Sequence, residues 1–552
     1  MHRRGAAAAL VVVLSLVSAA CGSETSGTPI SIETRTHRDA AACSDAFVTH
    51  DLPHLTKGPG STASTFDGTG AGIAAGDFDG DGDTDLVIPN LSGATQVLEN
   101  TGDPAAWEPH ALVAGRFRGA AAVDLDADDD LDIVLSTGIG PPVLFTNGLA
   151  PGETLADDPF ERGQIDGVRA ATYAFAFSDL GGDGDLDLVT GSYNAELTII
   201  RNTPVLGSDS GVILYERNAL GFSPIRMSPD AQALAMALAD VDGDDRIDIV
   251  VGNDLATADF IWLDSEDGWQ PSTPFSTTTY STMSYDAADL DGDGRTEFFA
   301  TDMAPLPSES LDDWREVIAD MEAAPQPDEV QIPENVLLRA GDDGFANEGA
   351  AVGIDATGWS WSGLFGDLDN DGAQDLYVVN GMRSELLFDF LPDARLVEPN
   401  QAFRNVDGDF ELMPGWDLAD TAGGRGAVLF DADGDGDLDI AVNNLDEPAR
   451  LFENRLCRGA ALTVELRQPG SGNTRALGAE LSFESDGLRA TRTITSTRGY
   501  LSAAAPVAHV GLGTVTTVDL TVRWPDGATS TVPDVSGNQH LVITREDRTS
   551  SN

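Results

Sequence analysis

The chain has 552 residues and a formal net charge of −61, from 92 acidic and 31 basic side chains. This charge excludes nucleic-acid binding through phosphate contacts, which require a basic surface. Hydrophobic residues make up 41% of the chain, and 59 glycines and 28 prolines indicate a folded, turn-rich protein rather than a disordered acidic one. No Gly-Lys-Ser/Thr sequence is present, which excludes a P-loop.

The N-terminus has the features of an export signal. Two arginines precede an apolar run over residues 6–20, which is too short to span a bilayer comfortably. Residues 17–21, Val-Ser-Ala-Ala-Cys, resemble a bacterial lipobox, which predicts a signal peptide over residues 1–20 and lipidation of Cys21. Ordinary signal cleavage near residue 20 is the alternative. We therefore expect an exported lipoprotein of the cell envelope or cell surface, held at the membrane by its lipid anchor alone, or otherwise a secreted protein.

Residues 21–43 are polar and rich in Ser and Thr, which predicts a flexible tether. Beyond a lipidated Cys21, the chain contains only Cys43 and Cys457, an even pair for an oxidising compartment. They flank the repeat region described next, so a disulfide between them would close that region end to end. Two isolated thiols are the alternative.

Seven copies of one ten-residue acidic loop organise the middle of the chain, with starts 47 to 78 residues apart. Each copy follows an apolar segment and precedes a short β-type run such as Ile133-Val134-Leu135. The unit is therefore strand, loop, strand, which disfavours helix-flanked EF-hands. Repeats at this spacing indicate a solenoid, a propeller or an array, and seven four-stranded units that close radially form a β-propeller. We predict an all-β chain with a seven-bladed β-propeller over residues 44–456.

The loop chemistry favours calcium, because carboxylates at positions 1, 3, 5 and 9 suit a hard cation with six to eight oxygen ligands. The carbonyl at position 7 can complete the shell, and glycine at position 6 supplies a positive φ. Asp129 and Asp245 replace that glycine in two loops. Plain acidic turns fit poorly, because such close like charges repel without a cation, and magnesium prefers stricter octahedral geometry. We expect up to seven calcium ions, structural rather than catalytic.

The candidate metal ligands are taken loop by loop from these positions. They are Asp77, Asp79, Asp81 and Asp85; Asp124, Asp126, Asp128 and Asp132; Asp179, Asp183 and Asp187; Asp240, Asp242, Asp244 and Asp248; Asp289, Asp291, Asp293 and Glu297; Asp367, Asp369, Asp371 and Asp375; and Asp431, Asp433, Asp435 and Asp439. In the third loop Gly181 replaces the position-3 carboxylate, so we expect this site to bind most weakly.

No catalytic residue can be assigned from the sequence. All seven histidines lie outside the acidic loops, and no two have the spacing of metal ligands. A catalytic carboxylate pair could nevertheless be hidden among so many acidic residues. Enzyme activity is therefore uncertain, although a binding role is favoured.

The loops resemble FG-GAP/VCBS repeats, the calcium-binding blades of integrin-like propellers, over roughly residues 65–455. An insertion near residues 302–333 carries apolar residues at helical spacing, which predicts a short amphipathic helix. After it, residues 335–338 and Gly358-Trp359-Ser360-Trp361 resemble the cartilage-acidic-protein branch of these repeats. Trp359 and Trp361 would share one strand face, where core packing is favoured over an exposed sugar platform.

Residues 457–548 lack acidic loops and resemble the ASPIC/UnbV module, a small β-rich domain. The resemblance rests on Gly499-Tyr500-Leu501-Ser502, on the residues around His509, and on the run at 518–527. His509 is expected in a turn between strands, buried and hydrogen-bonded rather than catalytic. The module brings no established activity. We therefore expect a calcium-binding adhesion or scaffold module for an unknown protein or glycan, with no nucleic-acid partner. The alternative is an extracytoplasmic, lyase-like enzyme acting on polysaccharide, built on a calcium-loaded propeller.

Overall fold

The computed structural model describes residues 26–58, 65–150, 153–203, 205, 209–255, 257–306, 331–341 and 344–546. The expected signal peptide, Cys21 and most of the expected helical insertion lie outside these residues. The described part is all-β, as predicted, apart from the helix α1 (Asn194–Arg201). Four short 3-10 turns also occur: η1 (Thr65–Thr69), η2 (Leu155–Asp157), η3 (Pro392–Ala394) and η4 (Pro414–Trp416). Within these ranges no helix has the length and apolar character that a membrane span requires.

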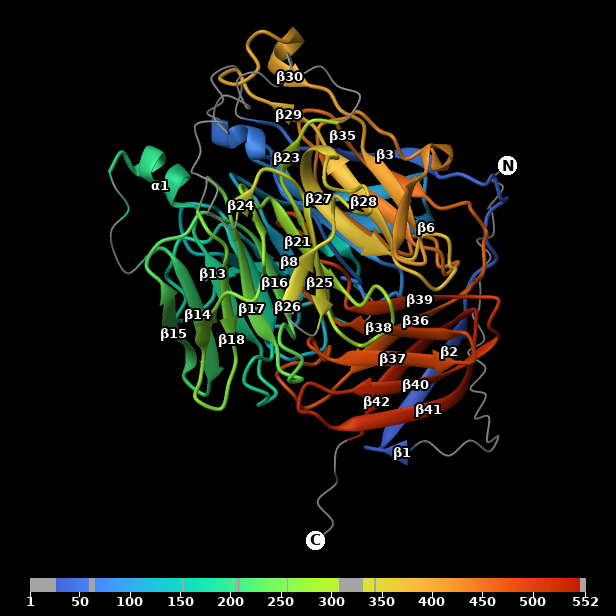
Figure 1. The fold of residues 1–552 in the computed structure, drawn as a ribbon. Coiled ribbons are helices and arrows are strands. Elements are labelled where there is room, and N and C mark those ends of the chain that lie inside the picture. Colours follow the sequence, from blue (N-terminus) through green and yellow to red (C-terminus); the bar gives the residue numbers. More distant parts are fainter. Residues whose placement is uncertain are drawn as a thin grey trace, which may run out of the picture.

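Seven sheets, numbered here in chain order, make up most of the described structure (Figure 1). Sheet 1 contains β4 (Ala74–Gly76), β5 (Asp85–Ile88), β6 (Ala94–Asp103) and β7 (Ala106–Ala114). Sheet 2 contains β8 (Ala120–Val123), β9 (Asp132–Leu135), β10 (Val143–Asn147) and β11 (Phe160–Gln164). Sheet 3 contains β12 (Ala174–Ser178), β13 (Asp187–Gly191), β14 (Val212–Asn218) and β15 (Gly221–Ser228). Sheet 4 contains β16 (Ala233–Ala239), β17 (Asp248–Asn253), β18 (Phe260–Leu263) and β19 (Gln270–Ser272).

Sheets 5 and 6 follow, and sheet 7 combines both ends of the repeat region. Sheet 5 contains β21 (Ser284–Ala288), β22 (Glu297–Thr301), β25 (Val336–Gly341) and β26 (Gly344–Asn347). Sheet 6 contains β23 (Met303–Ala304), β27 (Gly358–Gly366), β28 (Asp375–Asn380), β31 (Gln401–Val406) and β32 (Asp409–Leu412). Sheet 7 contains β33 (Gly424–Phe430), β34 (Asp439–Asn444), β35 (Pro448–Glu453) and β3 (Val48–Leu55). Two small pairs complete this part: β20 (Thr278–Thr279) with β24 (Gln331–Ile332), and β29 (Met382–Arg383) with β30 (Arg395–Leu396).

Within each of the seven sheets the main strands are antiparallel to their neighbours. Each acidic loop connects the first main strand to the second, so all seven loops have the same place in their sheets. In sheet 7 the outermost strand, β3, comes from the beginning of the chain and pairs with β35. Chain segments about 400 residues apart in sequence therefore share one sheet.

Small residues bring the first strands of neighbouring sheets together. Strands β4, β8 and β16 consist largely of alanine, and all three are buried along their whole length. Contacts join β4 to β8, β12 to β16, β16 to β21, β21 to β27, β27 to β33, and β33 back to β4. Sheet 1 and sheet 7 are therefore neighbours in space.

The C-terminal module forms two further sheets with its own strands, red and orange in Figure 1, and each sheet also includes one blue N-terminal strand. One has the order β1 (Ser26–Gly27), β41 (Thr529–Ser536), β40 (Thr517–Arg523), β37 (Glu480–Ser485) and β38 (Leu488–Thr493). The other has the order β2 (Ile30–Thr36), β42 (Gln539–Arg545), β36 (Ala460–Arg467) and β39 (Val507–Gly513). Their inner faces are apolar and belong to one core cluster with sheets 1 to 3.

The predicted flexible tether over residues 21–43 is therefore wrong for residues 26–36. Strand β2 pairs with β42 along its whole length, and β1 pairs with β41. The cause is long-range: a polar segment gains its backbone hydrogen bonds from an edge strand about 500 residues away, which composition does not reveal. The alternation of Ile30 and Ile32 with polar residues was the available signal.

A segment of the C-terminal module, residues 495–503, lies among the first strands of the sheets, and we call it the central segment. Ser496 Oγ donates a hydrogen bond to Phe177 O of sheet 3 (2.7 Å), and the Gly499 amide donates to Tyr285 O of sheet 5 (3.1 Å). The Ala120 amide of sheet 2 donates to Leu501 O (3.3 Å). A Cβ on Gly72, just before sheet 1, would lie 1.9 Å from that same oxygen, so only glycine fits there.

Trp359 and Trp361 are both buried, as predicted for core packing. The indole of Trp361 lies between Tyr500, with ring centroids 5.0 Å apart, and the guanidinium of Arg425, 4.5 Å from the ring centroid. His509 is buried and hydrogen-bonded as expected, but it lies within β39, so the predicted turn is wrong. Gly511 and Gly513 beside it have no side chain, which allows β39 to pack closely against the sixth acidic loop.

Cys43 and Cys457 form a disulfide in the structure, with their Cα atoms 5.6 Å apart and a sequence separation of 414. The bond joins the segment before β3 to the segment after β35, the two strands that complete sheet 7. It therefore fixes the pairing between the two ends of the repeat region.

Reduction, or Cys457→Ser, is expected to lower the free energy of unfolding by about 2–5 kcal/mol, since the open chain regains loop entropy. Urea unfolding monitored by tryptophan fluorescence, with calcium present, measures this difference. The alkylated Cys457→Ser protein is the control, because added reductant should not destabilise it further. Identical unfolding curves with and without reductant would contradict the prediction.

Candidate metal centres

The seven acidic loops share one backbone structure. In every loop the position-6 amide donates a hydrogen bond to the position-1 carboxylate, at 2.8–3.1 Å. The position-7 amide donates to the position-5 carboxylate over the same range. These bonds curl the loop around its own carboxylates and leave other lone pairs of the same oxygens for a cation.

Position 6 has a positive φ in all seven loops, between 69° and 103°. The prediction of a left-handed residue here is confirmed, and it holds for Asp129 and Asp245 as well as for the five glycines. Aspartate tolerates this region better than most residues. The repeated turn is thus a property of the ten-residue motif rather than of each sheet.

The position-9 carboxylate connects its loop to the rest of the sheet. One of its oxygens accepts a hydrogen bond from the position-2 amide in all seven loops, at 2.7–3.1 Å. In six loops its other oxygen accepts from an amide at the end of the third strand, as Asp85 does from Asn100 (2.8 Å). The ligand at this position is therefore rigidly held by three segments of one sheet.

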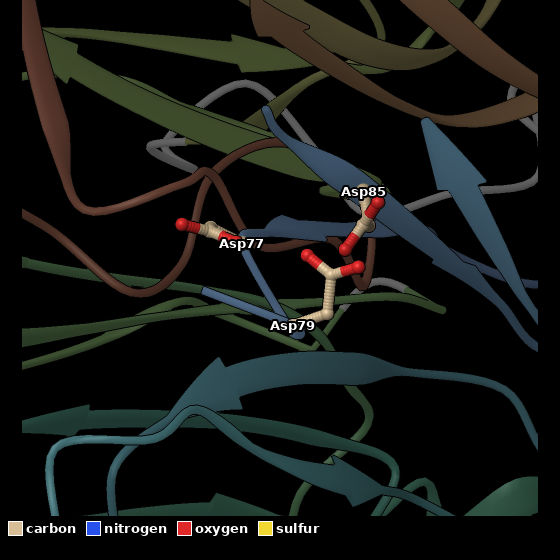
Figure 2. A group of neighbouring side chains, drawn as sticks. All are labelled: Asp77, Asp79 and Asp85. Atoms are coloured by element: carbon tan, nitrogen blue, oxygen red, sulfur yellow. The ribbon is translucent and has the colours of Figure 1, made fainter. Parts of the chain in front are cut away.

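Three predicted ligands come together in each of five loops, with one oxygen from each residue within 4.8 Å of the others. The groups are Asp77, Asp79 and Asp85; Asp124, Asp126 and Asp128; Asp240, Asp242 and Asp248; Asp289, Asp291 and Glu297; and Asp367, Asp369 and Asp371. In the first loop the carboxylates of Asp79 and Asp85 face each other beside Asp77 (Figure 2). A converging set of hard oxygens fits calcium, with the position-7 carbonyl as a further candidate donor.

The third loop differs from the others in the way its position-9 carboxylate is used. Gly181 takes the place of the position-3 aspartate, and its amide donates to Asp187 Oδ2 at 3.2 Å. The amide of Leu180 donates to the same oxygen at 3.0 Å. This loop thus offers one carboxylate fewer and a position-9 oxygen that already accepts two bonds, which is consistent with the weakest site.

Burial raises the pKa of most of the candidate ligands, and neighbouring carboxylates add to the effect, whereas the hydrogen bonds from Arg295 lower the pKa of Asp293 despite its burial. Burial raises the pKa of Asp132, Asp187 and Asp248 to about 7, and the pKa of Asp435 to about 8. Their ordinary value is 3.8. A protein that keeps such carboxylates close together at neutral pH needs either protons or cations among them.

These pKa directions predict how the calcium-free protein responds to pH. A carboxylate whose pKa is higher in the folded state than in the unfolded state costs stability as pH rises through the folded value. Calcium-stripped protein should therefore melt roughly 5 °C or more higher at pH 5.5 than at pH 8. Calcium should reverse the trend, because its ligands must be deprotonated. Thermal melts in metal-free and calcium-containing buffers test this, and a calcium-free melt that falls on acidification to pH 5.5 would contradict it.

Each of the seven loops also contacts the C-terminal module or the segment that follows β2. In the second loop Asp124 Oδ2 accepts a hydrogen bond from Thr474 Oγ1 (2.6 Å). In the sixth, Asp367 Oδ2 accepts from the Gly511 amide (3.0 Å). In the remaining loops, Arg38 donates to Asp83, the Asn473 amide donates to Gly184 O, and Arg523 donates to Asp245 O. Arg489 O packs closely against Gly292, and His509 Nε2 donates to Gly436 O. The module therefore covers the loop end of the sheets.

Sequence reasoning missed the asparagines that link neighbouring sheets. The side-chain amides of Asn100, Asn147 and Asn454 each donate to the position-2 carbonyl of the acidic loop in a neighbouring sheet, at 2.7–2.8 Å: the seventh, first and sixth loops, respectively. In sheet 3 Arg217 does the same, donating to Leu125 O. A sequence signal existed, because an asparagine recurs at the end of the third strand in sheets 1, 2, 6 and 7.

The fold and the loops define an all-β protein with repeated acidic turns. Family models match both the repeat region and the C-terminal module. The profile of the FG-GAP-like repeat family matches residues 77–135 and 240–300, and that of the ASPIC and UnbV family matches residues 469–550. The chain thus carries FG-GAP-like repeats and an ASPIC/UnbV region, as predicted.

Among curated proteins, the chain is similar to cartilage acidic protein 1. The human protein is 32% identical over 137 residues, which is 24% of this chain and 21% of the relative. The mouse protein is 34% identical over 121 residues, which is 21% of this chain and 19% of the relative. The matches span about a fifth of the length of these relatives.

A solved structure, described as the basis of specific recognition of non-reducing terminal N-acetylglucosamine by an Agrocybe aegerita lectin, was also matched. It is 15% identical, with a TM-score of 0.37, and the match covers 70% of this chain and 95% of that one.

Proposed function

We propose that the protein is an exported, calcium-binding propeller protein that acts as a binding or scaffold module for another macromolecule. The observation that carries this proposal is the sevenfold repetition of one carboxylate loop with the same hydrogen bonds in every copy. Calcium in these loops would offset part of their negative charge and hold the loop end of each sheet in one shape. The resulting scaffold is rigid, and rigid scaffolds present binding loops at their ends.

The proposed architecture is a seven-bladed β-propeller in which the seven sheets are the blades. It is supported by contacts between six of the seven pairs of first strands that a closed ring would bring together, including the return from β33 to β4. The pairing of β3 with β35 further supports it, because a shared last sheet closes a ring of blades. The central segment would then occupy the middle of the ring.

The partner would bind at the end opposite the acidic loops, because the C-terminal module covers the loop end. In antiparallel sheets the connections between second and third strands lie at that opposite end. Exposed apolar side chains occur in four of these connections: Ile139, Ile199, Leu255, Leu386, Phe390 and Val397. Figure 1 shows α1, β29 and β30, which belong to these connections, away from the module. Exposed apolar side chains concentrated at one end favour a protein partner.

The proposal is tested by capture of surface partners with the calcium-loaded chain lacking its first 21 residues. The double variant Leu386→Asp, Phe390→Asp should lose the partner. Leu220→Asp is the matched control, since Leu220 is 98% exposed but lies in the β14–β15 hairpin at the loop end. Loss confined to the double variant supports the proposal. Equal capture by all three proteins, or no partner above background, would reject it.

A further inference from the structure

A cleft of about 640 Å³ lies between the acidic loops and the C-terminal module. Its walls come from the first, second, sixth and seventh loops on one side and from β2, β36, β39 and β42 on the other. The rim is formed by exposed residues such as Glu33 and Arg35, whereas Arg475 and His509 at the inner wall are more than nine-tenths buried. The volume is that of a small-molecule site.

The cleft concentrates arginines in a strongly acidic protein, alongside nine acidic side chains. Six of the 31 basic residues line it: Arg35, Arg38, Arg467, Arg475, Arg492 and Arg498. Most of its acidic side chains are already engaged. Asp83 pairs with Arg38, and Glu465 pairs with Arg467 and Arg475, while Asp77, Asp367 and Asp431 are candidate calcium ligands.

Several polar atoms of the cleft wall have no partner among the described residues. Arg492 donates from Nε to His509 O and from Nη1 to Thr491 O, both at 2.9 Å, but its Nη2 is buried and unpartnered. Arg475 Nε is likewise unpartnered. His509 donates from Nε2 to Gly436 O (3.0 Å), so its Nδ1 carries a lone pair, and that atom is also buried without a partner. Unpaired buried groups of this kind are costly unless an occupant satisfies them.

We propose that this cleft binds a small organic anion, whose carboxylate pairs with Arg492 and whose hydroxyl donates a hydrogen bond to His509 Nδ1. The combination of a free guanidinium donor and a free imidazole acceptor fits a hydroxyl-bearing carboxylate such as a sugar acid. Arg35 at the rim adds attraction for the anion. The cleft ligand is distinct from the macromolecular partner proposed above, and either proposal can fail without the other.

Calorimetric titration of the calcium-saturated chain with glucuronate tests the proposal, with glucose as the neutral match. Glucuronate should bind and glucose should not. Arg492→Gln should weaken glucuronate at least about tenfold, the effect of losing one charged contact. Arg489→Gln is the matched control, because Arg489 lies on the same strand, β38, but is outside the cleft and exposed. A calcium-saturated melt shows whether each variant is folded.

Binding lost in Arg492→Gln and kept in Arg489→Gln supports the proposal. If Arg492→Gln does not fold, Arg35→Gln at the exposed rim takes its place and should weaken glucuronate measurably. No glucuronate binding at millimolar concentration, equal binding of glucose, or unchanged affinity in both cleft variants would overturn it. Inorganic sulfate that binds as tightly as glucuronate would overturn the hydroxyl contact to His509.

Discussion

Removal of calcium should lower the melting temperature by roughly 15 °C, the largest effect expected for this protein. An ion that binds only the folded chain at 100 times its dissociation constant contributes about 2.7 kcal/mol. In a chain of this size each kilocalorie shifts the melt by about 1 °C, so seven ions that act together, at about 19 kcal/mol in total, account for a shift of this order. The loops also carry the contacts to the C-terminal module, so their distortion affects both parts. Differential scanning calorimetry with excess chelator, followed by calcium restoration, measures this.

The second acidic loop offers a matched pair of variants for the same experiment. Asp128 at position 5 converges with Asp124 and Asp126, whereas Asp130 at position 7 is expected to contribute its carbonyl only. Asp128→Asn should remove one ion from the stoichiometry measured by native mass spectrometry, and Asp130→Asn should not. Magnesium should restore less of the melt than calcium. An unchanged melt in excess chelator, or the same ion count in both variants, would refute calcium binding by these loops.

Tyr500→Ala should lower the free energy of unfolding by about 3–5 kcal/mol, the cost of a cavity left by a large aromatic side chain. Tyr500 is fully buried in the central segment, and its ring packs edge-on against Trp361. Its hydroxyl lies 3.3 Å from that of Tyr173, which immediately precedes β12 of sheet 3. The side chain therefore links the C-terminal module to two sheets. Urea unfolding of the calcium-saturated protein measures the loss.

Tyr500→Phe is the control for this variant, because it removes only the hydroxyl and should cost about 1 kcal/mol. Limited proteolysis gives a second readout. The segment between β35 and β36, residues 454–459, should be cut faster in Tyr500→Ala than in Tyr500→Phe, because the module is less firmly docked. If Tyr500→Ala costs less than Tyr500→Phe, the central segment does not hold the module in place.

Features within ten to twenty residues were predictable from the sequence because local chemistry determines them. The acidic loops, their left-handed sixth residue and the strands on either side all follow from the repeated spacing of aspartate, glycine and apolar residues. Even Asp129 and Asp245 adopt the predicted backbone, since the loop's own hydrogen bonds require it. The burial of Trp359 and Trp361 followed from strand periodicity for the same reason.

Only the tertiary structure decided which distant segments meet. The strand over residues 30–36 has a polar composition typical of a tether, and it is ordered because β42 offers it an edge. The Gly499–Ser502 motif was visible as a motif, but its place among the first strands depends on small residues such as Gly72 in other repeats. The cleft likewise exists only where the loop end and the C-terminal module face each other. The sequence by itself determined the repeating unit and its chemistry, whereas long-range backbone pairing and side-chain packing decided how the units, the two termini and the module fit together.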